Sequence, residues 1–307
     1  MKNIYILLSF AAMFLIVCQA SAQIATLDKL DSLDNKIDSL LKNSKKASFK
    51  LGVNYLSNNV FMGRADTVTT AIVLPELKYT FKNGIFVSAG ANYIPNRVNN
   101  KLDGGSLAGG YDFDITDNFA GGISFTKLFY NSTSTEIGSS ISSVISANLN
   151  YDIASIITPT LSVDYNIIKQ GFGNDVFINA GLSHDFAVEG IFGKKDLFII
   201  SPTVTMNAGT QNFYDAYFVL KKYKLTAKAQ ALATAAQKLI AKRKEQLSQF
   251  EMLNYEFSAP VEYKIGVLIF SFIPTYAVAE NKLPPRITKG QASGNIFFFE
   301  TGATLKF

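Results

Sequence analysis

The chain has 307 residues, of which 48% are hydrophobic and only 17% charged, with one Cys and no Trp. This charge content is low for a soluble protein. Beyond the N-terminus, no segment reaches the roughly eighteen uninterrupted apolar residues of a spanning helix, which excludes helical membrane spans. The formal net charge of +5 comes from one segment, residues 219–250. Because this segment is expected in a loop on the outer surface, where nucleic acid is seldom met, the charge does not indicate a nucleic-acid partner.

Residues 1–22 have the pattern of a secretory signal peptide. Lys2 gives a positive start, the apolar run over 4–18 follows, and small residues precede the expected cleavage before Gln23. The apolar run is short for a retained membrane anchor. Because Cys18 leaves with the signal, we expect a mature chain without disulfide or thiol chemistry.

Residues 23–47 predict a short periplasmic helix. Leu30, Leu33, Ile37 and Leu40 follow a 3-4-3 spacing, with Asp and Lys between them. A helix of this length is only marginally stable in isolation. The segment either forms a homo-oligomer contact or plugs a lumen, or it is a solvated spacer; the pattern leaves these alternatives open.

From residue 48 onward, alternation with a period of two predicts an all-β domain, a transmembrane antiparallel β-barrel over 48–307. We predict about twelve strands, near 48–56, 69–82, 85–95, 105–115, 119–130, 141–153, 159–168, 176–187, 197–208, 252–262, 265–278 and 295–307. Short connections, such as Asn83-Gly84 and Tyr263-Lys264, alternate with longer polar ones. This alternation is typical of periplasmic turns and extracellular loops, and the even number of strands places both termini of the chain in the periplasm.

The last strand ends on an aromatic residue, Phe307, while the alternation still continues. Phe297, Phe299 and Leu305 share the face of Phe307, which is expected to face lipid. This ending resembles the terminal aromatic signal by which Gram-negative outer-membrane barrels are recognised. We therefore predict that Phe307 is a barrel-assembly signal, that the assembly machinery is a partner, and that the protein resides in the cell outer membrane.

Residues 219–250 lack Gly and Pro and predict a long helix inside the fifth extracellular loop. The segment holds eight Lys and Arg residues and a single acid, Glu245, so it carries the basic charge of the chain. Such a helix could lie on the phosphates of lipopolysaccharide, next to the outer-membrane lipid. The alternative is a solvated insertion without a partner.

Alternation also assigns the inner face of the barrel. The side chains predicted to line the lumen are Glu76, Asp112, Asp164, Glu256, Glu300, Lys50 and Lys78. Acids outnumber bases on this predominantly polar wall, which favours cations over anions. A barrel of twelve strands is narrow, however, and inward side chains or a long loop could close it.

The sequence does not predict an enzyme. The only histidine is His184, and its neighbours Ser183 and Asp185 point to the opposite face of a strand, so they cannot form a triad with it. None of the short motifs for zinc, thiol or nucleotide chemistry occurs in the chain. We accordingly expect no catalytic residues, no metal and no cofactor.

Two short motifs resemble a group of uncharacterised Gram-negative outer-membrane barrels. They are Ser57-Asn58-Asn59-Val60-Phe61-Met62-Gly63-Arg64 after the first strand and Phe270-Ser271-Phe272-Ile273-Pro274-Thr275-Tyr276 in the eleventh. The resemblance covers 49–307 and implies a barrel without implying a substrate. The resulting expectation is a passive, cation-preferring pore for small solutes. The alternative is a non-transporting barrel with a blocked lumen, serving as an adhesion, receptor or structural protein.

Overall fold

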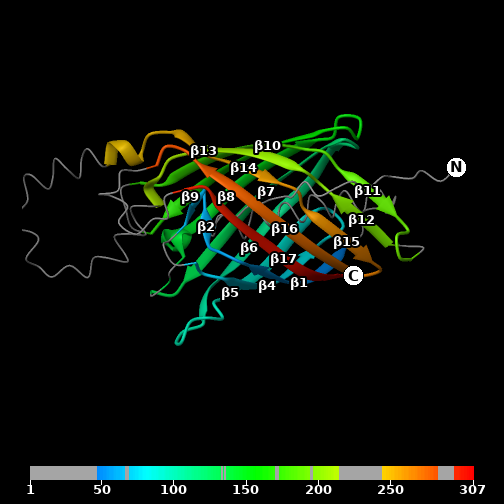
Figure 1. Ribbon diagram of the computed structural model, residues 1–307, viewed down its shortest axis with the longest axis horizontal. Helices are drawn as coiled ribbons and strands as arrows, with labels where there is room; N and C mark the ends of the chain where they lie inside the picture. Colours follow the sequence, from blue (N-terminus) through cyan, green and yellow to red (C-terminus); the bar gives the residue numbers. More distant parts are fainter. Residues whose placement is uncertain are drawn as a thin grey trace, which may run out of the picture.

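The computed structural model describes residues 47–65, 69–132, 134, 136–169, 173–193, 196–213, 244–282 and 294–307. Its main sheet is a closed antiparallel barrel of twelve strands (Figure 1). Around the ring these strands are β1 (Ser48–Leu56), β4 (Ile72–Thr80), β5 (Ile85–Tyr93), β6 (Leu102–Thr116), β7 (Phe119–Tyr130), β8 (Ile141–Tyr151), β9 (Thr158–Ile168), β10 (Asp175–Ser183), β13 (Thr203–Gly209), β14 (Glu251–Ser258), β16 (Leu268–Ala279) and β17 (Ile296–Lys306). The predicted all-β antiparallel barrel and its number of strands are confirmed.

Three further strands continue barrel strands beyond a break. They are β11 (Phe186–Glu189) after β10, β12 (Asp196–Ile200) before β13, and β15 (Val261–Ile265) after β14. Two of the breaks contain Pro202 and Pro260. Proline has no N–H to give to the ladder, so the strand is interrupted there without leaving the wall.

The two ends of the barrel differ. At the turn end, short connections join the strands, and β1 begins beside Phe307; at the loop end, the longer connections lie (Figure 1). The predicted turn at Tyr263-Lys264 is wrong. β15 runs to Ile265, and the chain reverses at Gly266, where φ is +61°. Glycine adopts this left-handed conformation without a steric penalty, and Lys264 instead becomes an inward strand residue.

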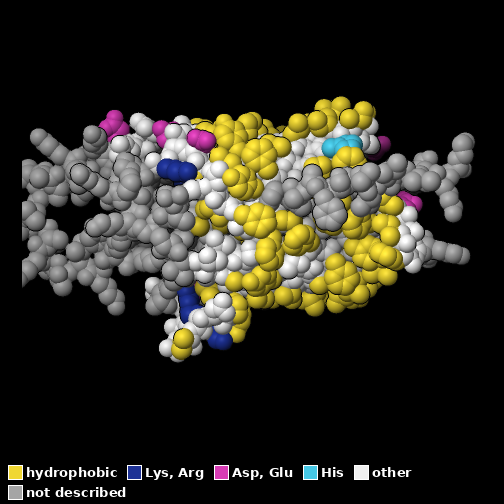
Figure 2. All heavy atoms as spheres, in the orientation of Figure 1, with side chains coloured by type: hydrophobic (Ala, Val, Ile, Leu, Met, Phe, Trp, Pro, Cys, Tyr) yellow, Lys and Arg dark blue, Asp and Glu magenta, His cyan; other side chains and the backbone are white. Residues whose placement is uncertain are grey.

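The outer face of the barrel is apolar. On β8, Ile145 is 50% exposed, whereas Ser146 beside it is 2% exposed and faces inward. Figure 2 shows hydrophobic side chains spread over the middle of the visible face, with Lys and Arg gathered toward the loop end. An apolar surface of this extent is what a lipid bilayer would contact. Within the described residues, no helix is both long and apolar enough to span a membrane.

The barrel closes between β1 and β17. Their register runs from Lys50 opposite Lys306 to Leu56 opposite Glu300. At the rim, the Phe49 amide donates to the Phe307 carbonyl (3.0 Å), and the Phe307 amide donates back (2.9 Å). The final residue of the chain is therefore part of the seam that makes the sheet continuous.

We predict that Phe307→Ala impairs assembly. The Phe307 side chain is 64% exposed on the outer rim, with its ring 6.4 Å from that of Phe49, so its removal spares the lumen and strips the closing strand of its terminal aromatic group. The amount of heat-modifiable protein in isolated membranes should fall. Phe297→Ala is the matched control, because Phe297 is also outward-facing and exposed but lies at the opposite end of the same strand. Equal amounts of both variants would contradict an assembly role.

The other predicted segments lie largely outside the described residues. These are the signal peptide 1–22, the segment 23–47 apart from its last residue, and the helix 219–250 up to residue 243. Residues 244–247 are described and form one helical turn.

Candidate functional site: the lumen and its closed end

On β1 and β8 the inward side chains lose solvent exposure from the turn end toward the loop end. On β8, Asn150 and Asn148 are partly exposed, whereas Ser146 is 2% exposed and Val144 is completely buried. On β1 the change is similar, from the partly exposed Lys50 to Leu56 at 1%. Water thus reaches the inner wall beside β1 and β8 near the turn end and is excluded from it near the loop end.

A hairpin in the first long loop accounts for this exclusion. β2 (Val60–Phe61) pairs with β3 (Arg64–Ala65), with Phe61 opposite Arg64, and we call residues 60–65 the lumen hairpin. Its two turn residues, Met62 and Gly63, both have positive φ, as a tight two-residue hairpin requires. A Cβ on residue 63 would also lie 2.7 Å from the Cβ of Asn254, so glycine is required for close approach to the wall.

The lumen hairpin packs into an apolar cluster that fills the loop half of the barrel. Phe61 is fully buried, with its ring 5.6 Å from that of Phe177 on β10 and 4.2 Å from that of Phe213. This apolar plug draws on strands from opposite sides of the ring, through Leu56, Ile72, Leu74, Leu128, Val144, Phe177, Leu253, Ile273, Ala277, Ile296 and Phe298. The expectation of a predominantly polar inner wall is therefore wrong for this half. The reason is that the wall here contacts protein instead of water.

Arg64 fixes the lumen hairpin to the loop-side ends of β13, β14 and β16. Its guanidinium is completely buried and donates to the carbonyl of Leu253 at 2.9 Å, as well as to the carbonyl of Met62 within the hairpin. It also donates to the side-chain oxygen of Gln211 (2.9 Å) and to the carbonyl of Glu280 (3.0 Å). The hairpin starts from β1, and Phe61 reaches Phe177 on β10, five places away around the ring, so the chain crosses the opening.

The seven side chains predicted to line the lumen all lie on inner faces of the barrel, but in different surroundings. Lys78 and Asp112 come together, with Nζ 3.4 Å from the carboxylate and 3.8 Å from the centre of the Phe86 ring. In the sheet register, Lys50 lies between Lys78 and Lys306, which places three bases in one row near the turn end. Glu76 is partly exposed and is the next inward residue of β4 after Lys78, toward the loop end.

The other three acids of the set are buried. Asp164 accepts hydrogen bonds from Ser146 Oγ (2.6 Å) and from Asn179 Nδ2 (3.0 Å), which ties β8, β9 and β10 together. Glu256 accepts from Asn254 Nδ2 at 2.6 Å, and Glu300 is only 1% exposed. These carboxylates lie on the inner wall but are shielded from the water-accessible half.

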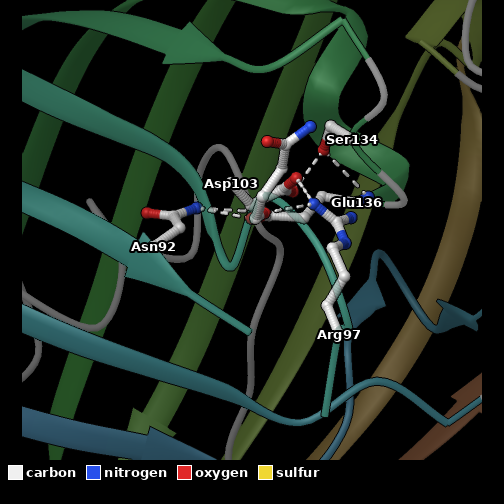
Figure 3. Close-up of polar contacts among 6 residues, drawn as sticks. Asn92, Arg97, Asp103, Ser134 and Glu136 are labelled. Atoms are coloured by element: carbon white, nitrogen blue, oxygen red, sulfur yellow. Dashed lines mark hydrogen bonds and ion pairs between the residues drawn. The ribbon is translucent and has the colours of Figure 1, made fainter. Parts of the chain in front are cut away.

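A second polar cluster lies on the loop side, and we call it the carboxyl latch (Figure 3). Glu136 and Asp103 are both completely buried. Asn92 Nδ2 donates to the two carboxyl oxygens of Glu136 at 2.8 and 2.9 Å, while Arg97 pairs with Asp103. Burial, and then the charge of Asp103, hold the pKa of Glu136 well above its ordinary value, against the opposing influence of Asn92 and Arg97.

The carboxyl latch connects the barrel wall to the plug. Glu136 directly precedes the short helix η1 (Ile137–Ser140), which contacts β2 of the lumen hairpin. From the end of η1, Ser140 Oγ donates to the carbonyl of Phe213 at 3.1 Å. Holding Glu136 against the wall therefore positions the helix that supports the hairpin. Sequence reasoning allowed for a lumen closed by inward side chains or a long loop. It missed the latch and the part played by the lumen hairpin, although Val60, Phe61 and Met62 form an apolar run in a loop expected to be polar.

The described part of the barrel includes His184, the only histidine of the chain. His184 lies at the break between β10 and β11, with Nδ1 against the carbonyl of Ile156 and its ring edge-on to Phe186 at 4.3 Å. Within these residues no cluster of three or more His, Cys, Asp or Glu side chains could hold a metal ion. The closed barrel and its apolar outer face define the class of transmembrane antiparallel β-barrels.

Comparison with known proteins adds only distant structural likenesses. No protein-family model and no curated protein matches the chain. Among solved structures it is similar to the KdgM porin (8% identity, TM-score 0.44, covering 85% of this chain and 99% of that one) and to the NanC porin (10%, 0.44, 84% and 100%). It is also similar to LpxR from Salmonella typhimurium (9%, 0.41, 84% and 99%). All three TM-scores are below 0.5, so the functional proposal below rests on the geometry of this barrel.

Proposed function

We propose that the protein is an outer-membrane β-barrel that is closed to solutes in the conformation described, with the lumen hairpin as its stopper. The observation that carries this proposal is the path of the hairpin across the opening, with Phe61 packed against Phe177 on β10 and Arg64 bound at the loop-side ends of β13 and β14. This geometry favours the blocked-lumen alternative over a permanently open pore.

The plug is too well packed to open often by itself. Displacing the hairpin exposes Val60, Phe61 and Met62, which are now at most 4% exposed. Burial of side chains of this size contributes about 1.5–3 kcal/mol each, so opening costs about 5 kcal/mol or more. On that scale roughly one molecule in several thousand is open at a given moment.

A cation-preferring pore is the second candidate, and it applies when the hairpin is displaced. Its support is the partly exposed carboxylates Glu76 and Asp112 in the turn half, although the row formed by Lys50, Lys78 and Lys306 acts against it. The two candidates thus describe one barrel in two states, and a single set of recordings separates them.

Planar-bilayer recordings test the proposal. The wild-type protein should show little conductance, whereas a variant with residues 60–65 replaced by Gly and Ser should conduct steadily and prefer cations. In that variant, Asp112→Asn should weaken the cation preference measured by reversal potential. Asp164→Asn should leave this preference unchanged, because Asp164 is buried. The control replaces residues 190–193 at the turn end. Equal steady conductance of the wild type and the hairpin variant would contradict closure, and anion preference would contradict the second candidate.

The carboxyl latch makes the closed state dependent on pH. The pKa of Glu136 is raised where this side chain is buried in the latch of the closed state. The contribution of the latch to the stability of the closed state is therefore complete below the ordinary pKa of a glutamate, where Glu136 is protonated in both the closed and the open state. It is lost as the pH rises through the raised pKa and Glu136 becomes charged beside Asp103. Openings in bilayer recordings should therefore become more frequent with rising pH. Glu136→Gln should abolish this dependence, and an unchanged pH profile in that variant would exclude the latch as its origin.

A further inference from the structure

In the described part of the chain, two lysines on the outer face of the loop end form no ion pair with an acid. Lys127 lies on β7 between Thr126 and Leu128, which are buried on the inner face, so Lys127 points outward. Lys169 follows β9 and is exposed. The sheet register places Lys127 opposite Ser143 and Ser143 opposite Ile167, so Lys169 lies two residues beyond that row, toward the loop end. Partial burial, and then repulsion from Lys127, lower the pKa of Lys169.

The polar contacts of both lysines are neutral. Lys127 Nζ donates to Ser143 Oγ at 3.1 Å, and Lys169 Nζ donates to the Ser139 carbonyl at 3.3 Å. Lys169 Nζ also lies 5.1 Å from the centre of the Tyr130 ring. Within the described chain, no carboxylate forms an ion pair with either lysine. Two adjacent cations without an anion are unfavourable, and a shared anion would offset their repulsion.

The wall directly below these lysines is apolar. Lys127 is in register with Ser143, and the next outward row toward the turn end is Phe125, Ile145 and Tyr165, which are 48%, 50% and 41% exposed. Three neighbouring strands thus present apolar side chains to the outside, with the two ammonium groups at their loop-side edge. This order matches a membrane lipid, whose anionic headgroup sits above its acyl chains.

We propose that Lys127 and Lys169 bind the phosphate of a phosphorylated outer-leaflet lipid, with its acyl chains against β7, β8 and β9. The inference rests on the outer-membrane placement in the proposed function, but it does not depend on whether the lumen is closed. A lysine binds phosphate as a point charge, so two lysines from different strands hold the headgroup without demanding one fixed orientation. The apolar row below them selects a lipid over a free phosphate ion.

The test measures lipid retention by the purified barrel in micelles, with native mass spectrometry as the readout. The probes are lipid A carrying two phosphates and the same lipid with its phosphates removed. Combining Lys127→Gln with Lys169→Gln should weaken binding of the phosphorylated lipid about tenfold or more. The matched control is Lys101→Gln, which removes another loop-end lysine, one that lies over a single tyrosine ring. It should leave binding within about twofold of the wild type.

Heat-modifiable mobility of each variant shows whether the barrel itself is intact. A wild-type protein that forms no such barrel would overturn the proposed function, whereas a folded double variant with undiminished lipid binding overturns only the lipid site. Equal losses in the double variant and in Lys101→Gln would likewise overturn it, because any loop-end charge would then suffice. Displacement of the lipid by millimolar inorganic phosphate would identify a free-phosphate site instead and contradict the lipid assignment.

Discussion

Arg64→Ala is expected to lower the free energy of unfolding by about 3–5 kcal/mol. The reason is that the backbone carbonyls and the Gln211 side-chain oxygen that accept hydrogen bonds from the buried guanidinium lose their donor. At least four acceptors are affected, including Leu253, Gln211 and Glu280. The lumen hairpin should also leave the plug, so the variant should conduct in bilayers. Urea unfolding in micelles, followed by circular dichroism, gives the stability.

Arg64→Lys is the matched control for this prediction. It keeps a positive charge but provides a single donor group, so it should be less destabilising than alanine and still weaker than the wild type. A loss below about 1 kcal/mol for Arg64→Ala would show that the guanidinium does not hold the hairpin.

A single arginine on the outer face should destabilise the barrel by about 2–4 kcal/mol if it lies near the bilayer midplane. Val163 and Leu149 are suitable positions, since they point outward on β9 and β8 and are 41% and 38% exposed. Asn148→Arg is the control, because Asn148 faces the partly wet half of the lumen. Unfolding in lipid vesicles gives the comparison. Similar losses for Val163→Arg, Leu149→Arg and Asn148→Arg would mean that the assignment of faces is wrong.

The barrel could be predicted from the sequence because its strands repeat with a period of two, and a shift of one residue would reverse both faces. The first strand was predicted over 48–56 and is observed at Ser48–Leu56; the fifth was predicted over 119–130 and is observed at Phe119–Tyr130. Boundaries were less accurate where proline interrupts a strand or where a glycine turn is delayed, as at Gly266.

The apolar plug was not predicted, although apolar residues occupy both faces of a strand near the loop end. On β4, Ile72 and Leu74 point inward, while the neighbouring Val73 points outward. Apolar side chains on two faces indicate that each face contacts something other than water. Together with the apolar run at Val60 and Phe61, this pattern would have predicted a loop folded into the lumen.

The carboxyl latch could not be inferred from spacing. Asp103 and Glu136 come from different elements, and their approach depends on an irregularity in the pairing of β5 with β6 beside Asn92. Such a bulge shifts the direction of a side chain without changing the residue pattern around it. Only the three-dimensional register shows that the carboxyl groups meet.

The most direct test of the closed lumen is the chemical accessibility of the hairpin. The only cysteine of the chain is Cys18, in the predicted signal peptide, so Ala65→Cys and Val98→Cys each introduce a single thiol into the mature protein. Ala65 is 1% exposed in the plug, and Val98 is 90% exposed on an outer loop. A water-soluble maleimide should label the folded Val98→Cys variant rapidly and the folded Ala65→Cys variant only after unfolding in urea. Equally rapid labelling of both folded variants would contradict a lumen closed by the hairpin.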